Sequence, residues 1–215
     1  MTPLLNTVSP ELNKVLKDRA KLRTFGQDEE LFAAGESADY LPIIVKGMAK
    51  MVQFPEPGKE VIIGIFGDGE MFALPPVIDG KQYPASAYAM EPSQILLLHR
   101  SDFLDLIRDS HEFTLAVLDW MSEMLRQKTA SIQTLAGGSA EQRIAGVLIR
   151  LFGSESGPAP IKIKLRREDI GRMAGLTTET TIRTIRRLAD SGVIRLEHGK
   201  IFIDEVGGLA RYLAT

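Results

Sequence analysis

Residues 165–183 read LRREDIGRMAGLTTETTIR, and this stretch decides the fold of the C-terminal third of the chain. Glu168–Ala174 has the composition of a short helix, and Gly175 provides a bend that needs no β-carbon. Thr177 is a suitable cap for a second helix that runs to about Ser191. Two helices joined by a glycine turn at this spacing predict a helix-turn-helix motif.

Short strands are predicted on both sides of this motif. The alternating segment Ile161–Leu165 comes before it. After Gly192, the segments Val193–Leu196 and Lys200–Ile203 are joined through His198-Gly199, as in a β-hairpin. The hairpin adds a wing, so the sequence predicts a winged helix-turn-helix.

The charge of the chain is concentrated in this same segment. The whole protein of 215 residues has 26 basic and 28 acidic side chains, whereas residues 161–203 hold ten basic and five acidic ones. Residues 1–110 are acidic, with 11 basic and 16 acidic side chains. A local basic patch on an otherwise mildly acidic protein indicates a polyanionic partner that approaches from one face.

The second helix of the motif is predicted to have a buried face and an outward face. Helical spacing directs Thr181, Ile185, Leu188 and Ala189 to the core. The outward face then holds Thr178, Glu179, Ile182, Arg183 and Arg186, concentrated in the first two turns, where a recognition helix meets base edges.

Several outward side chains suit base reading. The Arg183 guanidinium matches guanine O6 and N7, and the Glu179 carboxylate accepts from a cytosine or adenine amino group. Ile182 has two interpretations: contact with a thymine methyl group, or packing beside Ile185 in the core. Arg166, Arg167, His198 and Lys200 suit phosphates, which orient a protein without reading sequence. The candidate DNA-binding residues are Arg166, Arg167, Thr177, Thr178, Glu179, Ile182, Arg183, Arg186, His198 and Lys200.

The N-terminal half has a different pattern. Ser9-Pro10-Glu11 predicts the start of a helix that ends near Ala20. Between Leu22 and His99, short apolar runs alternate with glycine turns, which predicts an antiparallel roll or barrel.

A long helix of about 25 residues is predicted from His111. It carries apolar residues at alternating spacings of three and four, as in a heptad seam. So narrow a seam favours packing against an identical helix, and therefore a homodimer; packing of one helix on the barrel is the alternative. The candidate dimer residues, called the seam below, are Leu118, Met121, Leu125, Lys128, Ile132 and Leu135.

Gly137-Gly138-Ser139 ends this helix and has the composition of a hinge, and a further helix is predicted to Phe152. The expected fold class is α+β, with a jelly-roll-like antiparallel β-roll over residues 1–110, a dimerisation helix over 111–137 and a winged helix-turn-helix over 138–215.

The stretch quoted first, followed by His198-Gly199-Lys200, closely resembles the helix-turn-helix of the CRP/FNR transcription regulators. The order of roll, long helix, hinge and winged domain is similar to that of the family along the whole chain. The resemblance implies a homodimer on a two-fold symmetric DNA site, with Glu179 and Arg183 at base-reading positions. Arg166 is a departure, because relatives often have a capping Thr or Ser there and arginine cannot cap.

The resemblance also implies which effectors do not fit. In the cyclic-nucleotide branch a glutamate and an arginine hold the ribose and the cyclic phosphate, and here Leu74 and Pro84 stand at those positions. A buried phosphate without a compensating cation is unfavourable by several kcal/mol, which argues against cyclic AMP. The chain has no cysteine, which excludes disulfides, thiolate catalysis and cysteine-ligated iron–sulfur clusters.

An apolar effector pocket is the expectation that remains for the roll. Its candidate lining residues are Met71, Phe72, Leu74, Tyr83 and Tyr88. The run Tyr83–Ala87 is similar to that of the nitric-oxide-responsive, haem-associated subgroup, and haem would need an axial ligand. His111, one heptad before Leu118, is the best candidate among the three histidines, because His198 belongs to the wing and His99 ends a strand.

The sequence therefore predicts a transcription regulator that binds DNA and is controlled by a small effector or a haem-bound gas. A nucleotide-binding module that acts through protein contacts is the alternative, and a regulator with an empty sensor is another. No catalytic motif stands out, so an enzyme is not expected. RNA polymerase is a candidate partner. Neither a secretory signal nor a membrane span is visible, so a cytoplasmic protein is expected.

Overall fold

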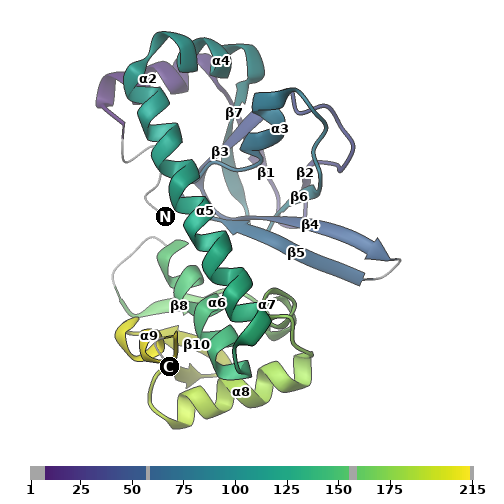
Figure 1. Ribbon diagram of the computed structural model, residues 1–215, viewed down its shortest axis with the longest axis vertical. Helices are drawn as coiled ribbons and strands as arrows, with labels where there is room; N and C mark the ends of the chain where they lie inside the picture. The colour runs from purple at the N-terminus through teal and green to yellow at the C-terminus, as the bar shows by residue number, and fades with distance from the viewer. Residues whose placement is uncertain (1–7, 57–58, 155–158, 214–215) are drawn as a thin grey trace. The chain divides into compact units, whose positions relative to one another are not determined.

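The computed structural model describes residues 8–56, 59–154 and 159–213 (Figure 1). The chain forms two compact units, Met1–Met124 and Leu125–Thr215. Their division falls inside the long helix α5 (His111–Gly137), whereas the sequence predicted domain boundaries at the two ends of this helix.

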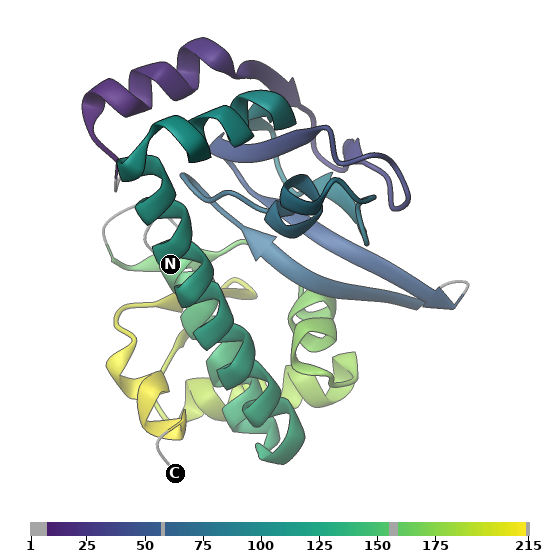
Figure 2. The same cartoon turned by 45° about the horizontal axis from the view of Figure 1, so that its top comes forward.

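Helix α2 (Pro10–Arg19) begins where the sequence predicted, with Ser9 as its cap. The Ser9 Oγ accepts a hydrogen bond from the Leu12 N–H at 3.2 Å. The Ser9 N–H and hydroxyl in turn donate to the Glu112 carboxylate at 2.5 and 3.0 Å, which ties the start of α2 to the first turn of α5. Leu12 and Leu16 are buried, and α2 lies beside α4 (Arg100–Asp109) at one end of the roll (Figure 2).

The roll consists of two antiparallel sheets, as expected from the short apolar runs. The sheet order is β1-β7-β3 in the first and β2-β6-β4-β5 in the second. Their strands are β1 (Lys21–Phe25), β2 (Glu30–Phe32), β3 (Tyr40–Lys46), β4 (Ala49–Glu56), β5 (Lys59–Phe66), β6 (Ser86–Ala89) and β7 (Ser93–His99). Apolar side chains from both sheets meet in one core, with Leu41, Ile43 and Leu98 fully buried.

A short helix that the sequence analysis missed, α3 (Leu74–Asp79), connects β5 to β6. Its prolines occupy the first turn, where a missing N–H leaves no hydrogen bond unmade. Arg100, at the start of α4, donates from Nε to the Val77 carbonyl at 2.8 Å and from Nη2 to the Ile78 carbonyl at 3.2 Å. The end of α3 is therefore fastened to the start of α4.

Helix α5 has 27 residues, close to the predicted length. Phe113, Val117 and Trp120 are buried in the core of the roll and recur at helical spacing. Leu118, on the same stretch of helix, is exposed. The N-terminal part of α5 is therefore amphipathic.

The second unit begins within α5 and contains the predicted winged helix-turn-helix. Ser139 and Gln142 form a capping box at the start of α6: Ser139 Oγ accepts from Gln142 N at 3.2 Å, and Gln142 Oε1 accepts from Ser139 N at 2.7 Å. Three short strands form a sheet in the order β8-β10-β9. The elements are α6 (Ala140–Ser154), β8 (Ile161–Ile163), α7 (Arg167–Ala174), α8 (Thr178–Asp190), β9 (Arg195–Glu197), β10 (Lys200–Ile203) and α9 (Gly207–Leu213).

Helix α9, which was not predicted, packs on α6, and Leu209 from α9 is fully buried. The core of this unit includes Ile144, Leu148, Ile170 and Ile201. In the described part of the chain, no helix combines the length and the apolar character that crossing a membrane requires.

Candidate nucleic-acid interface

Helices α7 and α8 approach each other closely because a glycine stands at their crossing. A β-carbon on Gly171 would lie 2.7 Å from Thr181 Oγ1 and 3.0 Å from the Leu176 carbonyl oxygen. Gly175, the predicted bend, has a φ of 62°, in the left-handed region that favours glycine. These two glycines fix the spacing of the motif.

The N-termini of α8 and α7 differ in whether the residue at the cap position makes a capping hydrogen bond. The Thr177 Oγ1 accepts from the Thr180 N–H at 3.2 Å and so caps α8. Arg166 stands at the corresponding position of α7 and makes no side-chain cap hydrogen bond, as predicted. Arg166 is exposed, which leaves its charge at the protein surface.

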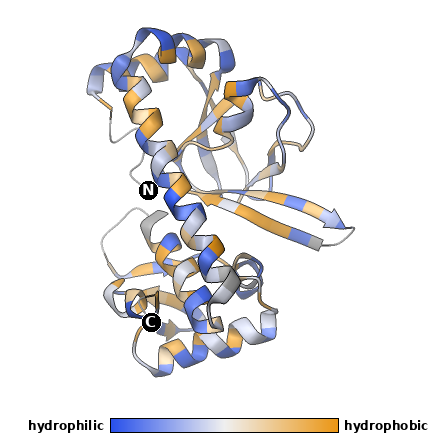
Figure 3. Ribbon diagram, in the orientation of Figure 1, coloured by the Kyte–Doolittle hydropathy of each residue, from blue (hydrophilic) through white to orange (hydrophobic). Residues whose placement is uncertain are grey.

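Helix α8 separates its two faces as the spacing predicted. Thr181, Ile185 and Leu188 are buried, and Ala189 is half-buried. Thr184 is buried as well, which the sequence analysis missed. The outward residues Thr178, Glu179, Ile182, Arg183 and Arg186 are all exposed, and the ribbon of α8 alternates between hydrophilic and hydrophobic colours (Figure 3). The interpretation of Ile182 as a core residue is therefore wrong.

The wing is a two-residue hairpin between β9 and β10. His198 and Gly199 have φ values of 47° and 75°, the combination found in a type I′ turn. The Arg167 Nη2 donates to the Gly199 carbonyl at 3.0 Å, and burial lowers the pKa of this guanidinium. Arg167 therefore holds the wing turn against α7 and is less available for phosphate than an exposed arginine. His198 and Lys200 are exposed.

The arginines of this unit divide into paired and unpaired groups. Arg172 pairs with Glu168, and Arg187 pairs with Glu141 at 2.7 Å. Arg195 donates to Asp204, which raises the arginine pKa and lowers the carboxyl pKa. Four of the candidate DNA-binding residues are exposed cations with no carboxylate at ion-pair distance among the described residues: Arg166, Arg183, Arg186 and Lys200. The positive charge of these four is uncompensated.

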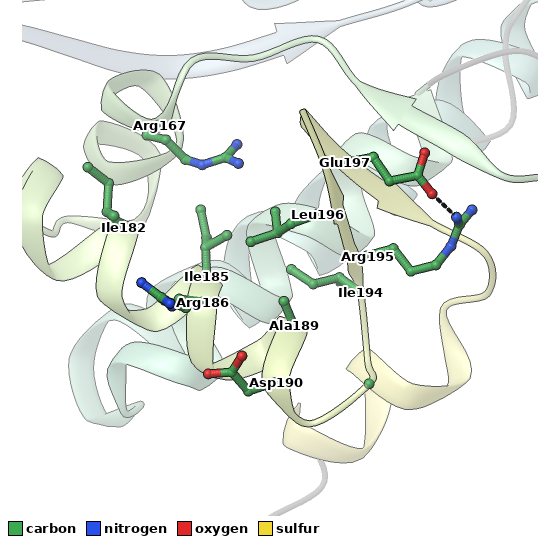
Figure 4. Close-up of a pocket in the computed structure, with 11 residues that line it drawn as sticks. Arg167, Ile182, Ile185, Arg186, Ala189, Asp190, Ile194, Arg195, Leu196 and Glu197 are labelled. Atoms are coloured by element: carbon green, nitrogen blue, oxygen red, sulfur yellow. Dashed lines mark hydrogen bonds and ion pairs between the residues drawn. The ribbon is translucent and has the colours of Figure 1, made fainter. Parts of the chain in front are cut away.

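A groove lies between α8 and the wing (Figure 4), with a volume of about 740 Å³. Ile185, Ala189, Ile194 and Leu196 line its apolar part. Ile182 and Arg186 line it from α8, Arg167 lines it from α7, and Asp190, Gly192, Arg195 and Glu197 complete the lining. The groove thus joins an apolar surface to the outward face of the predicted recognition helix.

The candidate effector residues in the roll fall into two groups. Met71, Phe72, Leu74 and Tyr83 are buried in one apolar cluster. Tyr88 is not in this cluster; its hydroxyl donates to Glu30 Oε2 at 2.8 Å. Tyr83 stacks on Phe32 with ring centroids 3.8 Å apart, and Phe72 stacks on Phe66 at 4.8 Å. The structure therefore brings four of the five predicted residues together.

Positions 74 and 84 offer no charge to an anion. Leu74 is fully buried, and Pro84 is exposed with its carbonyl accepting from Gln53 Nε2 at 3.1 Å. The arginine bonded to α3, Arg100, binds carbonyls at the end of the helix opposite to Leu74. The buried indole N–H of Trp120 finds no hydrogen-bond partner in the described part of the chain.

The predicted haem ligand, His111, is exposed at the first residue of α5 and is not part of the apolar cluster. His99 caps α4 by accepting from the Ser101 N–H at 3.2 Å. Among the residues that the structure describes, no group of three or more carboxylate and imidazole side chains is arranged to hold a metal ion.

Four of the predicted seam residues present apolar surface on a single chain: Leu118, Met121, Leu125 and Ile132 are exposed. Lys128 is exposed as well, and its pKa is lowered, first by partial desolvation of its ammonium group and then by the charge of Arg150. The side chain of Leu135 lies outside the described residues. The seam remains a prediction, supported by this exposure.

Comparison with known proteins matches two families to the two parts of the chain. Residues 22–110 match the cyclic nucleotide-binding domain, and residues 142–212 match the Crp-like helix-turn-helix domain. The "Cyclic AMP receptor protein" of Thermus thermophilus is 26% identical, covering 95% of this chain and 93% of its own. A "CRP-like cAMP-activated global transcriptional regulator" of Mycobacterium tuberculosis is also 26% identical, with the same coverage.

Solved structures show the same fold. The Thermus thermophilus catabolite activator protein is 26% identical, covers 99% of both chains and gives a TM-score of 0.56. FixK2 from Bradyrhizobium japonicum gives a TM-score of 0.79 at 21% identity, covering 90% of this chain and 96% of its own. The expected α+β fold class is confirmed.

Proposed function

The chain belongs to the CRP/FNR family of transcription regulators, in which a cyclic nucleotide-binding domain is followed by a Crp-like helix-turn-helix domain, and on this premise we propose how it acts. Two copies associate through the seam of α5 and place their α8 helices in successive major grooves of a two-fold symmetric DNA site. Half-sites one DNA turn apart, about 34 Å, suit such a dimer. The protein works in the cytoplasm, and RNA polymerase is a further partner.

The observation that carries this proposal is the outward face of α8. Its base-reading candidates Glu179 and Arg183 are exposed, and Arg183 and Arg186 lack carboxylate partners among the described residues. Unpaired guanidinium groups on a rigid helix are suited to guanine and phosphate. The Glu179 carboxylate would repel phosphate, so its presence favours sequence reading over nonspecific binding.

Fluorescence anisotropy on a palindromic duplex, measured over a salt series, tests this proposal. Arg183→Ala should weaken binding by about 5- to 150-fold per half-site, because a bidentate contact to guanine contributes about 1–3 kcal/mol. Arg19→Ala, which removes the same charge from the exposed end of α2, is the matched control and should leave the affinity nearly unchanged. An affinity for the duplex that changes neither with salt concentration nor with Arg183→Ala would contradict the proposal.

We further propose that the effector is a small, largely uncharged molecule that binds in the roll. Cyclic AMP, named in several relatives, carries a phosphate that needs a cation. Leu74 and Pro84 stand where the cyclic-nucleotide branch has a glutamate and an arginine, and Leu74 lies in an apolar cluster with Phe72 and Tyr83. The unpartnered indole N–H of Trp120, in the same cluster, favours a ligand that carries a hydrogen-bond acceptor.

Haem with a bound gas is a different candidate effector, because haem carries two anionic propionates and its proposed axial ligand, His111, is exposed and lies outside the apolar cluster. An absorption spectrum after haem addition tests it, because axial ligation by imidazole changes the haem spectrum. His111→Ala should abolish the change, and His99→Ala, which removes the other histidine of the first unit, should preserve it.

A nucleotide-binding module that acts through protein contacts is the second candidate, favoured by the match to the cyclic nucleotide-binding domain. Calorimetry with cyclic AMP separates the two. Tight binding together with an absence of DNA preference would favour the second candidate over a DNA-binding regulator.

A further inference from the structure

We propose that Ile182 makes this protein select the 5-methyl group of a pyrimidine at one defined position in each DNA half-site. The inference rests on the proposed DNA-binding function. It adds a base preference that the polar groups of Glu179 and Arg183 do not provide.

The stability of the fold does not explain why an isoleucine stands at position 182, on the exposed face of α8. Its side chain is 52% exposed, although it lies on a helix that buries Thr181 and Ile185 on either side of it in sequence. The core stripe of α8 is complete without it. An isoleucine on an exposed helix face also has a lower helix propensity than Ala, Leu or Arg, so the helix itself gains nothing from it.

The neighbours of Ile182 are the two strongest candidates for base reading. Glu179 precedes it by one helical turn, Arg183 follows it directly, and all three side chains are exposed. A helix that inserts Glu179 and Arg183 into the major groove therefore carries Ile182 into the groove with them.

In the major groove only one chemical group, the C5-methyl group of thymine, makes a favourable apolar contact with an alkyl side chain. Guanine, adenine and cytosine present hydrogen-bonding groups there, whereas thymine adds an apolar C5-methyl group. An isoleucine placed over a polar edge removes water without replacing its hydrogen bonds, which is unfavourable. Ile182 is therefore expected to favour a methylated pyrimidine and to disfavour the other bases.

The groove between α8 and the wing extends the apolar surface behind Ile182. Figure 4 shows Ile182 and Arg186 on the α8 side, with Ile185 and Leu196 lying further into the groove. Leu196, on β9, is 38% exposed. Because Leu196 belongs to the same groove but not to the recognition helix, it provides a matched control.

The experiment begins with selection of the preferred site from a random duplex pool with the full-length protein. Each thymine of a selected half-site is then replaced by deoxyuridine, which removes only the methyl group. At one thymine per half-site the affinity should fall about fourfold, and about 15-fold when both half-sites are changed, as expected for one buried methyl group.

A cytosine arm separates methyl recognition from recognition of thymine as a whole. The critical thymine is replaced by cytosine and then by 5-methylcytosine, each paired with guanine. The methyl group should strengthen binding by about the same fourfold factor. An equal affinity for cytosine and 5-methylcytosine would show that thymine O4, not the methyl group, is read, and would overturn the inference.

Two variants assign the effect to a residue. Ile182→Ala should bind the thymine and uracil duplexes equally well, whereas Leu196→Ala should retain the difference between them. A thymine-to-uracil ratio of one at every position, or a ratio unchanged in Ile182→Ala, would overturn the inference while DNA binding persists. Failure to select any site would instead overturn the proposed function.

Discussion

The phenol of Tyr83 is held between an aromatic ring and a backbone carbonyl. It stacks on Phe32, and its hydroxyl donates to the Tyr40 carbonyl at 2.5 Å. Burial raises the pKa of Tyr83 to about 12, and the Asp39 carboxylate adds to the shift. The neutral phenol is thus strongly preferred in the folded protein.

A pH dependence follows from this shift. The unfolded phenol titrates near 10.0 and the folded one near 12, so the stabilisation is complete below pH 10 and is lost as the pH rises from 10 through 12. Absorbance titration should show one of the four tyrosines ionising last, together with the loss of stability. Tyr83→Phe should remove the late titration. Ionisation of all four tyrosines near pH 10 would contradict the assignment.

Arg166 combines a poor helix cap with an unpaired charge, so its replacement should have opposite effects on two measurements. Arg166→Ser should stabilise the protein by about 1 kcal/mol, because serine can cap α7. The same variant should weaken DNA binding and lower the salt slope by about two, as expected when one phosphate contact is lost in each half-site. Arg166→Ala is the control: it should lose DNA affinity equally without the gain in stability, which thermal unfolding and anisotropy would measure.

For single residues, the sequence predicted well which side chains are buried and which are exposed, but it did not predict their hydrogen-bond partners. The helical period alone places Arg183 on the exposed face of α8 and Ile185 on its buried face. The hydrogen bond of Arg167 to Gly199 joins residues that are far apart in sequence, and periodicity cannot detect it. Tyr88 and Tyr83 are both predicted to line the effector pocket, yet their hydroxyls donate to different partners, Glu30 and the Tyr40 carbonyl.

Among the elements, the crossing of α7 and α8 depends most on one residue. Gly171→Ala should destabilise the second unit by about 1–3 kcal/mol, since the new methyl group would overlap Thr181 and the Leu176 carbonyl. DNA binding should weaken with it, because α8 would be displaced. Both effects are measurable by chemical denaturation and anisotropy.

The matched control lies in the neighbouring helix. A β-carbon on Gly146 of α6 would meet its nearest atom, Leu213 Cδ2, at 3.8 Å, an ordinary contact. Gly146→Ala should therefore stabilise the protein by about 0.5–1 kcal/mol through helix propensity. Destabilisation by both substitutions to the same extent would contradict the role given to Gly171.

Elements with strong periodicity or capping residues could be predicted, and short ones could not. α5 and α8 carry an unambiguous helical repeat, and α2 has a serine cap. α3 has only six residues, and its two consecutive prolines are typical of a turn. The burial of Val77, which follows the prolines, supports a helix but cannot be read from the sequence. α9 has seven residues, of which the first two are glycines, and it is held by packing on α6 rather than by its own propensity.

For the whole molecule, the testable prediction is dimerisation through the seam of α5. Leu125 is 69% exposed on a single chain, and Leu125→Arg should place a charge against the partner helix. Sedimentation should then show a monomer, and affinity for the two-fold site should fall with it. Leu22→Arg, at a leucine that is 54% exposed on β1, is the matched control and should remain dimeric. A dimer that survives Leu125→Arg would place the interface elsewhere.

The overall architecture was predictable because each part has its own signature: glycine-separated strands, a heptad seam and a basic helix-turn-helix. The division into units was not predictable. The sequence predicts boundaries at the two ends of α5, after residue 110 and at Gly137-Gly138, whereas the two compact units divide after Met124, inside this helix, where no local sequence signal stands.

Helix α5 continues without interruption from the first unit into the second. The number of residues in this helix therefore sets the rotation about its axis of every residue that follows Met124. One residue inserted into α5 after Met124 turns everything that follows by about 100° and advances it by about 1.5 Å, whereas seven residues return it to within about 20° of its original direction. Any chimera that exchanges the first unit for that of a relative therefore has to conserve the count of residues along this rod in steps of seven, because other lengths would point Leu118 and Leu125 toward different neighbours.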